Sequence, residues 1–329
     1  MQSYPAMQDL TEIFATIKHL FDEQQFCFEP TELYEPIDYT LRLGGKRLRP
    51  ALLLASNQMM GGEMEEALSA AVGIETFHNF TLLHDDVMDR SPLRRGQPTV
   101  WTRWDENTAI LSGDTMFALA WRYFLKKPHT NLQAILDCFN ETAIEVCEGQ
   151  QYDMNFERRD EVPLDEYMMM IRKKTAVLLA GAMKIGAMYA GADEEDLRHL
   201  YDCGINMGLA FQIQDDLLDA YADQNTFGKP IGQDIRDHKK TYMILHALEL
   251  CNPTERVELK SLYNTDRHDE KSVNAVLEKY DKLGMKAHAE EEIVRLMKIA
   301  ENELAEVKAS DERKTPIKEL ISTLIGRQR

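Results

Sequence analysis

The chain has 329 residues, of which 44% are hydrophobic and 29% charged, so it has enough apolar material for a large core and lacks the composition of a disordered chain. Its formal net charge of -18 excludes general nucleic-acid binding, because phosphate backbones require a basic surface. An anionic ligand would need metal ions or a local basic patch to offset the negative field of the protein.

Cysteine usage and hydropathy set further limits. The five cysteines form no CxxC motif, so we expect neither a disulfide framework nor a structural zinc site. No apolar run reaches the roughly 18 residues of a membrane-spanning helix, and residues 1–20 lack the pattern of a signal peptide. We therefore expect a cytoplasmic protein with no integral membrane segment.

Helical periodicity dominates the whole chain. Apolar spacing predicts helices within the ranges 1–30, 31–43, 51–72 (two helices, separated at Gly61-Gly62), 77–90, 109–125, 132–155 and 163–190, around 212–219, and through 243–329. The isolated glycines at 181, 186, 204 and 208 indicate helices that pack closely. With no strand alternation and no linker rich in Pro, Gly or Ser, we predict an all-α protein in which residues 1–329 form a single domain.

Acidic residues crowd one turn at the end of the helix predicted over 77–90. Asp85, Asp86 and Asp89 are three and four residues apart, so their carboxylates share one face and repel each other. A helix tolerates this arrangement readily only when a cation lies between the carboxylates. Two fixed cations, Arg94 and Arg95, follow five residues later.

A second helix repeats the arrangement with Asp215, Asp216 and Asp219. Two such clusters facing each other would form a divalent-metal site for a substrate rich in phosphate oxygens. Mg2+ prefers oxygen ligands and binds through a few carboxylates plus substrate phosphates. As a Lewis acid it would make a diphosphate a better leaving group.

A glycine-rich basic loop covers 44–50. Three basic residues, Lys46, Arg47 and Arg49, fall within four positions, and Gly44 and Gly45 would let the backbone approach a ligand closely. The alternative is an ordinary solvated turn, since short basic runs are common.

Together these residues resemble the trans-isoprenyl diphosphate synthases of the polyprenyl synthetase family. The resemblance runs from about Leu43 to Thr241 and includes, in the order of the family, the motifs GGKRLRP at 44–50, DDxxD at 85–89, RRG at 94–96, GQQxD at 149–153, KT at 174–175, FQIQDDxxD at 211–219 and GK at 228–229. A single DDxxD would be a weak signal, because acidic helices are common. The ordered set at family spacing is strong evidence.

The resemblance implies a role for each matching residue. The metal ligands would be Asp85, Asp86, Asp89, Asp215, Asp216 and Asp219, holding three Mg2+ ions, although not every carboxylate need touch metal. The allylic substrate or its pyrophosphate would be contacted by Arg94, Lys174, Gln212, Lys229 and Lys239. Isopentenyl diphosphate would be bound by Lys46, Arg49, His78 and Arg95.

The implied reaction is a head-to-tail condensation of isopentenyl diphosphate with an allylic diphosphate, which gives a longer all-trans prenyl diphosphate and pyrophosphate. Pyrophosphate departs, the isopentenyl double bond attacks the allylic cation, and a proton is lost. Oxygen dipoles of Thr175, Gln212 and the Lys174 backbone would stabilise the positive charge. The family also implies one large helical bundle around a central deep pocket that excludes water, and a homodimer.

Product length would depend on residues upstream of the first aspartate cluster. In the family, bulky side chains there form the floor of the pocket, and here Phe80 is five and Phe77 eight residues before Asp85. The pattern resembles enzymes that make C15 to C20 products, while the small Thr81 argues against the strictest C15 limit. The alternative is that both phenylalanines belong to the core.

Other functions are weighed against this one. A metal phosphohydrolase could use His84 with Asp85, but it leaves the second DDxxD unexplained. A class I terpene cyclase would be expected to lack the second DDxxD and the isopentenyl site. A silent partner subunit would be expected to have lost one aspartate cluster, and here both are intact. The sequence departs from the family at His238, where Gly commonly precedes Lys239, and at Tyr242-Met243, where Leu-Pro is common; these changes put the local loop conformation in doubt. A basic tail containing Arg327 and Arg329 could fold over the diphosphate site, or be solvated.

Overall fold

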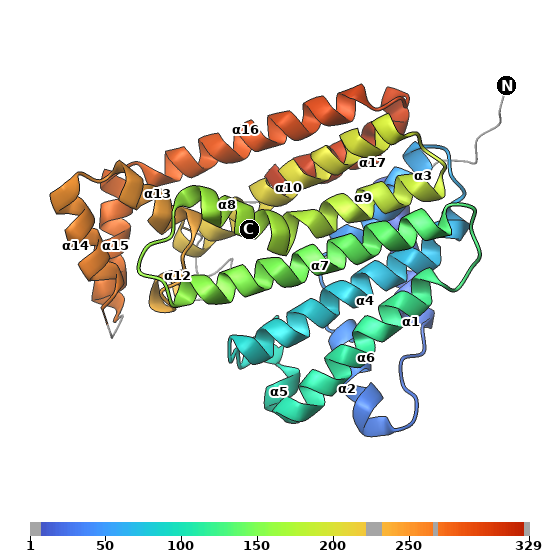
Figure 1. The fold of residues 1–329 in the computed structure, drawn as a ribbon, viewed down its shortest axis with the longest axis horizontal. Coiled ribbons are helices and arrows are strands. Elements are labelled where there is room, and N and C mark those ends of the chain that lie inside the picture. The colour runs from blue at the N-terminus through green and yellow to red at the C-terminus, as the bar shows by residue number, and fades with distance from the viewer. Residues whose placement is uncertain (1–7, 222–231, 266–268, 326–329) are drawn as a thin grey trace. The chain divides into compact units, whose positions relative to one another are not determined.

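The structure, a computed structural model, describes residues 8–221, 232–265 and 269–325 (Figure 1). Its helices in the first half of the chain are α1 (Leu10–Glu23), α2 (Thr31–Arg42), α3 (Leu48–Met59), α4 (Met64–Met88), α5 (Val100–Arg103), α6 (Glu106–Phe124) and α7 (Leu132–Glu157). The second half contains α8 (Leu164–Ile171), the π-helical turn η1 (Arg172–Ala176), α9 (Val177–Tyr189), α10 (Glu194–Tyr221), α12 (Gln233–Arg236), α13 (Tyr242–Leu250), α14 (Pro253–Tyr263), α15 (Glu270–Lys282), α16 (Met285–Glu306) and α17 (Asp311–Ile325).

The all-α prediction is confirmed, because the described residues contain only two short strands, β1 (Leu93–Arg94) and β2 (Gln97–Pro98). They pair antiparallel, with Arg94 opposite Gln97. Among the described helices, none combines the length and the apolar character that crossing a membrane requires.

The chain divides into two compact units. Unit 1 comprises Met1–Phe139, Ala182–Arg198 and Lys308–Ile317, and unit 2 comprises Asn140–Gly181, His199–Val307 and Lys318–Arg329. The division falls within helices α7, α9, α10 and α17 and just before α17 begins. The expectation of a single domain stays a prediction.

Unit 1 is built around α4, which packs mainly against α3 and α6. The first half of α4 is rich in Ala and Gly and is buried, so neighbouring helices approach its backbone closely. A Cβ atom added at Gly73 would lie 3.1 Å from the Ala120 carbonyl oxygen of α6. This packing fixes the last turn of α4, which carries the first aspartate cluster.

Unit 2 uses glycine in the same way. A Cβ atom at Gly204 or Gly208 of α10 would lie 2.5 Å from Ala180 Cα or 2.4 Å from Ala176 Cα, closer than a non-bonded contact allows. The prediction that isolated glycines mark close helix packing is therefore confirmed. The elements α13, α15 and α16 pack on one another and complete this unit.

Several predicted boundaries need correction. The acidic stretch ends the helix that begins at Met64 and is not a separate helix, because nothing interrupts the chain after Gly61-Gly62. The helix predicted over 163–190 is interrupted by η1, a turn that helical periodicity alone does not reveal. The loop over 90–99 contains the β1–β2 hairpin, whose central residues Arg95 and Gly96 both have positive φ, as a tight two-residue hairpin turn requires.

Candidate functional site

The first aspartate cluster occupies the C-terminal end of α4. Asp89 caps the helix, and its backbone N–H donates to the Asp85 carbonyl at 2.8 Å. The C-terminal end of a helix already carries partial negative charge, so three carboxylates there are electrostatically unfavourable. Asp85 and Asp89 are more exposed than Asp86, which is 4% exposed.

Asp86 is bound by protein. Arg94 Nε donates to both carboxylate oxygens, at 2.9 and 2.8 Å, and Arg94 Nη2 lies 2.8 Å from Oδ1. Burial raises the pKa of Asp86, and the bond with Arg94 opposes that rise. Arg94 ends β1 of the hairpin, directly before the tight turn at Arg95-Gly96 that pairs β1 with β2.

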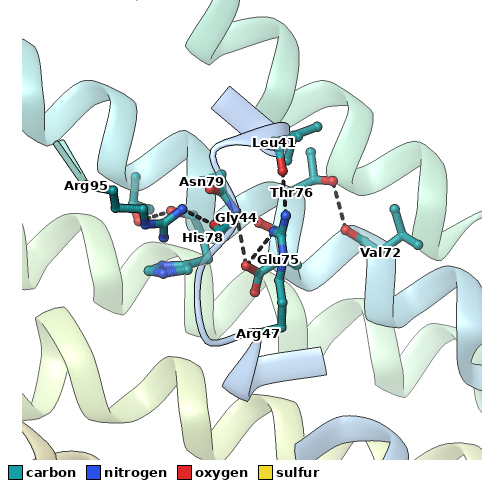
Figure 2. Close-up of polar contacts among 10 residues, drawn as sticks. Leu41, Gly44, Arg47, Val72, Glu75, Thr76, His78, Asn79 and Arg95 are labelled. Atoms are coloured by element: carbon teal, nitrogen blue, oxygen red, sulfur yellow. Dashed lines mark hydrogen bonds and ion pairs between the residues drawn. The ribbon is translucent and has the colours of Figure 1, made fainter. Parts of the chain in front are cut away.

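The predicted isopentenyl-diphosphate residues all belong to unit 1, and Figure 2 shows two of them, His78 and Arg95, near Gly44 of the basic loop. Arg95 Nη1 donates to the Gly44 carbonyl, so the hairpin is joined to the basic loop. Burial, together with the positive charges of Arg49 and Arg95, lowers the pKa of His78 well below its usual range. The imidazole is therefore neutral at neutral pH. Lys46 is exposed at the tip of the loop.

Aromatic rings surround the predicted chain-length residues. Phe77 is fully buried, and its ring contacts those of Phe80, Phe117 and Phe139 at centroid distances of 5.5, 5.7 and 5.3 Å. The half-buried Phe80 stacks on Phe117 at 5.3 Å and 25°. The hydroxyl of Thr81 donates to the His78 carbonyl at 2.8 Å. Sequence reasoning missed Phe117, because an apolar residue on α6 carries no signal of which helix it faces.

The second aspartate cluster lies near the end of α10 in unit 2. Asp215 is exposed, Asp219 is half-buried and Asp216 is 5% exposed. Asp216 accepts hydrogen bonds from the Tyr167 hydroxyl, from the Tyr242 backbone N–H at 2.9 Å and from Gln212 Nε2 at 3.2 Å. Burial raises the pKa of Asp216 to about 7, and the three donors oppose that rise. In both clusters, protein donors thus hold both carboxylate oxygens of the second aspartate.

A cavity of about 270 Å³ in unit 2 is lined by most of the predicted residues of that unit. The predicted residues in its lining are Asp215, Asp216, Asp219, Lys174, Thr175, Gln212 and Lys239. The lining also contains Asp153, Tyr167 and Asp234, for which no role was predicted. The backbone N–H of Asp234 donates to Asp219 Oδ2 at 3.0 Å. Burial and the neighbouring Asp219 charge raise the pKa of Asp234 well above its usual range.

In unit 2, a hydrogen-bonded relay runs from Thr175 through Gln212 to Asp216, and Lys174 forms a separate ion pair with Asp153. Lys174 Nζ donates to Asp153 Oδ2 at 2.6 Å, and Thr175 Oγ1 donates to Gln212 Oε1 at 3.0 Å. Gln212 in turn donates to Asp216, so its amide is oriented from both ends. Both Lys174 and Thr175 belong to the π-helical turn, which shifts their direction relative to a regular helix.

The loop before α13 contains His238, the position at which the sequence departs from the family. His238 adopts a left-handed backbone with φ 54°, and its ring Nδ1 lies 2.7 Å from the Tyr263 carbonyl. The Tyr263 hydroxyl contacts the Lys239 carbonyl, and the Lys239 N–H donates to the Asp234 carbonyl at 2.9 Å. Histidine thus occupies a position that favours glycine, and contacts with Tyr263 hold it there. Lys229, Arg327 and Arg329 lie outside the described residues.

The donor set fits a hard divalent cation, since both clusters offer carboxylate oxygens and buried acidic neighbours whose repulsion a cation would relieve. Within the described part of the chain, no three ligand-type side chains converge closely enough to enclose an ion by themselves. Mg2+ commonly keeps waters and takes further oxygens from phosphate.

Comparisons with known proteins find related sequences and structures. A sequence model of the polyprenyl synthetase family matches residues 30–280. A short chain isoprenyl diphosphate synthase of Methanothermobacter thermautotrophicus is 37% identical over 285 residues, covering 86% of this chain and 87% of that protein. A geranylgeranyl diphosphate synthase of Sulfolobus acidocaldarius is 40% identical over 256 residues, covering 76% and 78%. The crystal structure of a geranylgeranyl pyrophosphate synthase is similar with a TM-score of 0.92 at 40% identity, covering 98% of this chain and 100% of the other.

The π-helical turn yields a first prediction. A Cβ atom at Gly149 of α7 would lie 2.2 Å from the Lys174 backbone nitrogen, so Gly149→Ala must displace the turn. We expect it to lower the free energy of unfolding by about 1–3 kcal/mol, as overpacking does, and to accelerate hydrogen exchange of the amides at 172–176. Urea unfolding and exchange followed by mass spectrometry measure the two effects.

The matched control is Gly204→Ala, whose Cβ would lie 2.5 Å from Ala180 Cα. It should destabilise to a similar extent without faster exchange at 172–176. Equal exchange of that segment in the two variants would show that Gly149 has no special relation to the turn.

Proposed function

The chain belongs to the polyprenyl synthetase family, and from that membership we propose how its residues carry out prenyl transfer. It is a prenyltransferase that condenses isopentenyl diphosphate head to tail with an allylic diphosphate and releases pyrophosphate. The structural observation that best supports the assignment of roles is the parallel between the two aspartate clusters, in each of which protein donors hold the second carboxylate.

We propose that Mg2+ is held by the more exposed members of each cluster, Asp85 and Asp89 in unit 1 and Asp215 and Asp219 in unit 2. The predicted six-residue set also included Asp86 and Asp216. Their bonds to Arg94 and to Tyr167, Tyr242 and Gln212 favour a positioning role, because each carboxylate is already bound on both oxygens. Three ions per site, as the resemblance implies, would neutralise the diphosphate and improve it as a leaving group.

The remaining roles follow from the relay in unit 2. Lys174 and Lys239 would bind the departing pyrophosphate as point charges. The Thr175 hydroxyl and the Gln212 amide would direct oxygen dipoles at the allylic cation, and the Thr175–Gln212 bond fixes their direction before substrate binds. Lys229 belongs to the predicted set and lies outside the described residues.

The basic cluster of unit 1 would bind isopentenyl diphosphate through Lys46, Arg49, His78 and Arg95. A neutral His78 suits this role, since it can donate one hydrogen bond to a phosphate oxygen without adding charge to a group of guanidinium ions. Arg94 is held by Asp86 through Nε and Nη2, and its Nη1 would serve the allylic diphosphate. We further propose that residues 1–329 act as one domain, in the cytoplasm and as a homodimer; these three statements rest on the sequence and the family.

The reaction itself is tested by product analysis. We expect incubation with radiolabelled isopentenyl diphosphate, an allylic diphosphate and Mg2+ to give a longer, acid-labile prenyl diphosphate of C15 to C20, and chelation of the metal to abolish it. Chromatography identifies the product and its length together. A cyclic hydrocarbon formed without isopentenyl diphosphate would instead identify a terpene cyclase, and absence of any incorporation would reject the proposal.

The two kinds of aspartate should respond differently to substitution. Asp86→Asn removes one partner of a buried ion pair, so we expect a loss of about 1–3 kcal/mol in the free energy of unfolding. Asp85→Asn, at a more exposed position, should lower the free energy of unfolding less. It should raise the Mg2+ concentration needed for half-maximal turnover more than about tenfold, the typical effect of losing a contact that supports a metal ligand. Urea unfolding and metal titration of turnover measure both.

The matched pair in unit 2 is Asp216→Asn and Asp215→Asn, for which the same contrast should hold. If Asp86→Asn and Asp216→Asn raise the metal requirement more than Asp85→Asn and Asp215→Asn do, then Asp86 and Asp216 are the metal ligands and the proposed assignment is wrong.

Phe80 should limit the length of the product. Its half-buried ring is held by Phe117 and forms the exposed part of the aromatic group, so Phe80→Ala would open space for further five-carbon units. We expect products longer than those of the unmodified enzyme, measured by chromatography after removal of the diphosphate. Phe77→Leu serves as the control, because the fully buried Phe77 should affect stability and leave the product unchanged. An unaltered product from Phe80→Ala would show that Phe80 is not the floor.

A further inference from the structure

The basic loop at 44–49 carries an unusual backbone. Gly44, Gly45 and Arg47 all have positive φ, at 78°, 129° and 49°. The first two are glycines, for which this conformation costs little, but Arg47 is not. A left-handed arginine at the N-cap of α3 needs contacts that hold it there.

Arg47 supplies those contacts by turning inward. Its Nη1 donates to Glu75 Oε1 at 2.8 Å, its Nη2 donates to the Leu41 carbonyl, and its guanidinium group stacks 4.2 Å from the centre of the Phe21 ring. Figure 2 shows the guanidinium group between the Glu75 carboxylate and the Leu41 carbonyl. One side chain thereby joins the loop to α1, α2 and α4, and both terminal nitrogens of its guanidinium group are bonded within the protein.

Glu75 is the buried anion of this group. It is 2% exposed, and its Oε1 also accepts a hydrogen bond from Asn79 Nδ2 at 3.2 Å. Within the described residues, its Oε2 has no hydrogen-bond partner, and neither has the buried Nε of Arg49. A buried carboxylate with one oxygen unbonded is costly unless positive charge surrounds it.

Positive charge does surround it. Burial lowers the pKa of Arg49 to about 10, and the charge of Glu75 opposes that fall. Burial likewise lowers the pKa of Arg95, and Glu75 is again the main opposing charge. Glu75 therefore stabilises the charged forms of Arg49 and Arg95 while forming its ion pair with Arg47. Arg94 is balanced separately, by Asp86.

We propose that Glu75 and Arg47 are a positioning pair for the isopentenyl-diphosphate site: their buried ion pair holds the loop at 44–49 so that Lys46, Arg49 and Arg95 are gathered before substrate arrives. Neither member touches substrate. The inference rests on the proposed function for the identity of the ligand, and it divides the three basic residues of the loop into one that faces inward and two that serve the diphosphate.

The sign of one kinetic effect tests the proposal. If Glu75 acted only as a negative charge near an anionic substrate, Glu75→Gln would lower the KM for isopentenyl diphosphate. If it positions the loop, Glu75→Gln should raise that KM about tenfold, with the KM for the allylic substrate unchanged within about twofold. An unchanged or lowered KM for isopentenyl diphosphate would overturn the inference.

A double-mutant cycle with Arg47→Met separates positioning from independent contacts. Because the two side chains act through one ion pair, the double variant should resemble each single variant, with a KM raised about tenfold and not about a hundredfold. Multiplied effects would show that Arg47 binds substrate itself, and would reject the pair. The control is Glu303→Gln, which removes a carboxylate bonded to His199 at 2.7 Å in unit 2 and should leave both KM values unchanged.

A readout that does not need turnover keeps this inference distinct from the proposed function. Hydrogen exchange of the amides at 44–51 should be faster in Glu75→Gln than in the unmodified protein, and unaltered in Glu303→Gln. If the unmodified protein incorporates no isopentenyl diphosphate, the proposed function fails while the exchange result still stands. Unaltered exchange at 44–51 overturns the pair whatever the activity.

Arg47→Lys covers the case in which Glu75→Gln does not fold. Lysine keeps the charge but lacks the planar fork that reaches both Glu75 and the Leu41 carbonyl. We expect Arg47→Lys to raise the KM for isopentenyl diphosphate about threefold, which is half of the tenfold effect of Glu75→Gln on a logarithmic scale. The kcat should be unchanged. A change in kcat alone would indicate a general loss of folded enzyme and would count against the pair.

Discussion

Repulsion between like charges is the constraint on which the arrangement of each aspartate cluster depends. Three carboxylates lie within one turn at the C-terminal end of α4, where the helix dipole is already negative. The protein resolves part of this cost internally, by giving the second aspartate of each cluster its own donors. In unit 1 the donor is the Arg94 guanidinium, and in unit 2 the donors are neutral hydroxyl, amide and backbone groups. The other carboxylates keep their charge nearer to solvent, where a divalent cation can complete the balance.

The different donors have different consequences. A guanidinium ion neutralises Asp86 and brings a cation close to Asp85 and Asp89, the proposed metal ligands of the first cluster. The neutral donors of Asp216 leave its charge uncompensated, and burial raises its pKa to about 7. The nearby Asp234 is raised as well. The cavity of unit 2 therefore brings several carboxyl groups together, and the cations among the described residues that line it are Lys174, Lys239 and Lys240.

The sequence was sufficient to predict the helical fold and the two aspartate clusters, but not the direction in which individual side chains point. Charge and spacing predicted the two aspartate clusters and the all-α fold, because helical periodicity and like-charge crowding are local properties. Nothing local distinguishes Lys46 from Arg47, although the structure turns one outward and the other into the protein. The π-helical turn at 172–176 was also invisible, since it is made possible by a glycine of α7 that is far away in the sequence. His238 shows the same limit: the sequence left the conformation of its loop in doubt, and the structure gives it a left-handed backbone with its ring against the Tyr263 carbonyl of α14.

A protein with a net charge of -18 binds anions only where cations have been gathered locally, and here these cations are gathered by acids. Arg94 is held by Asp86, Lys174 by Asp153, and Arg47 by Glu75. Each acid lowers the repulsion between neighbouring cations and fixes their position. In the proposed roles, a diphosphate would meet cations whose positions are already set, which costs less reorganisation than assembling exposed, solvated cations. It also explains why buried acids belong in a site whose ligands are anions: they determine where the positive charge stands before the substrate is present.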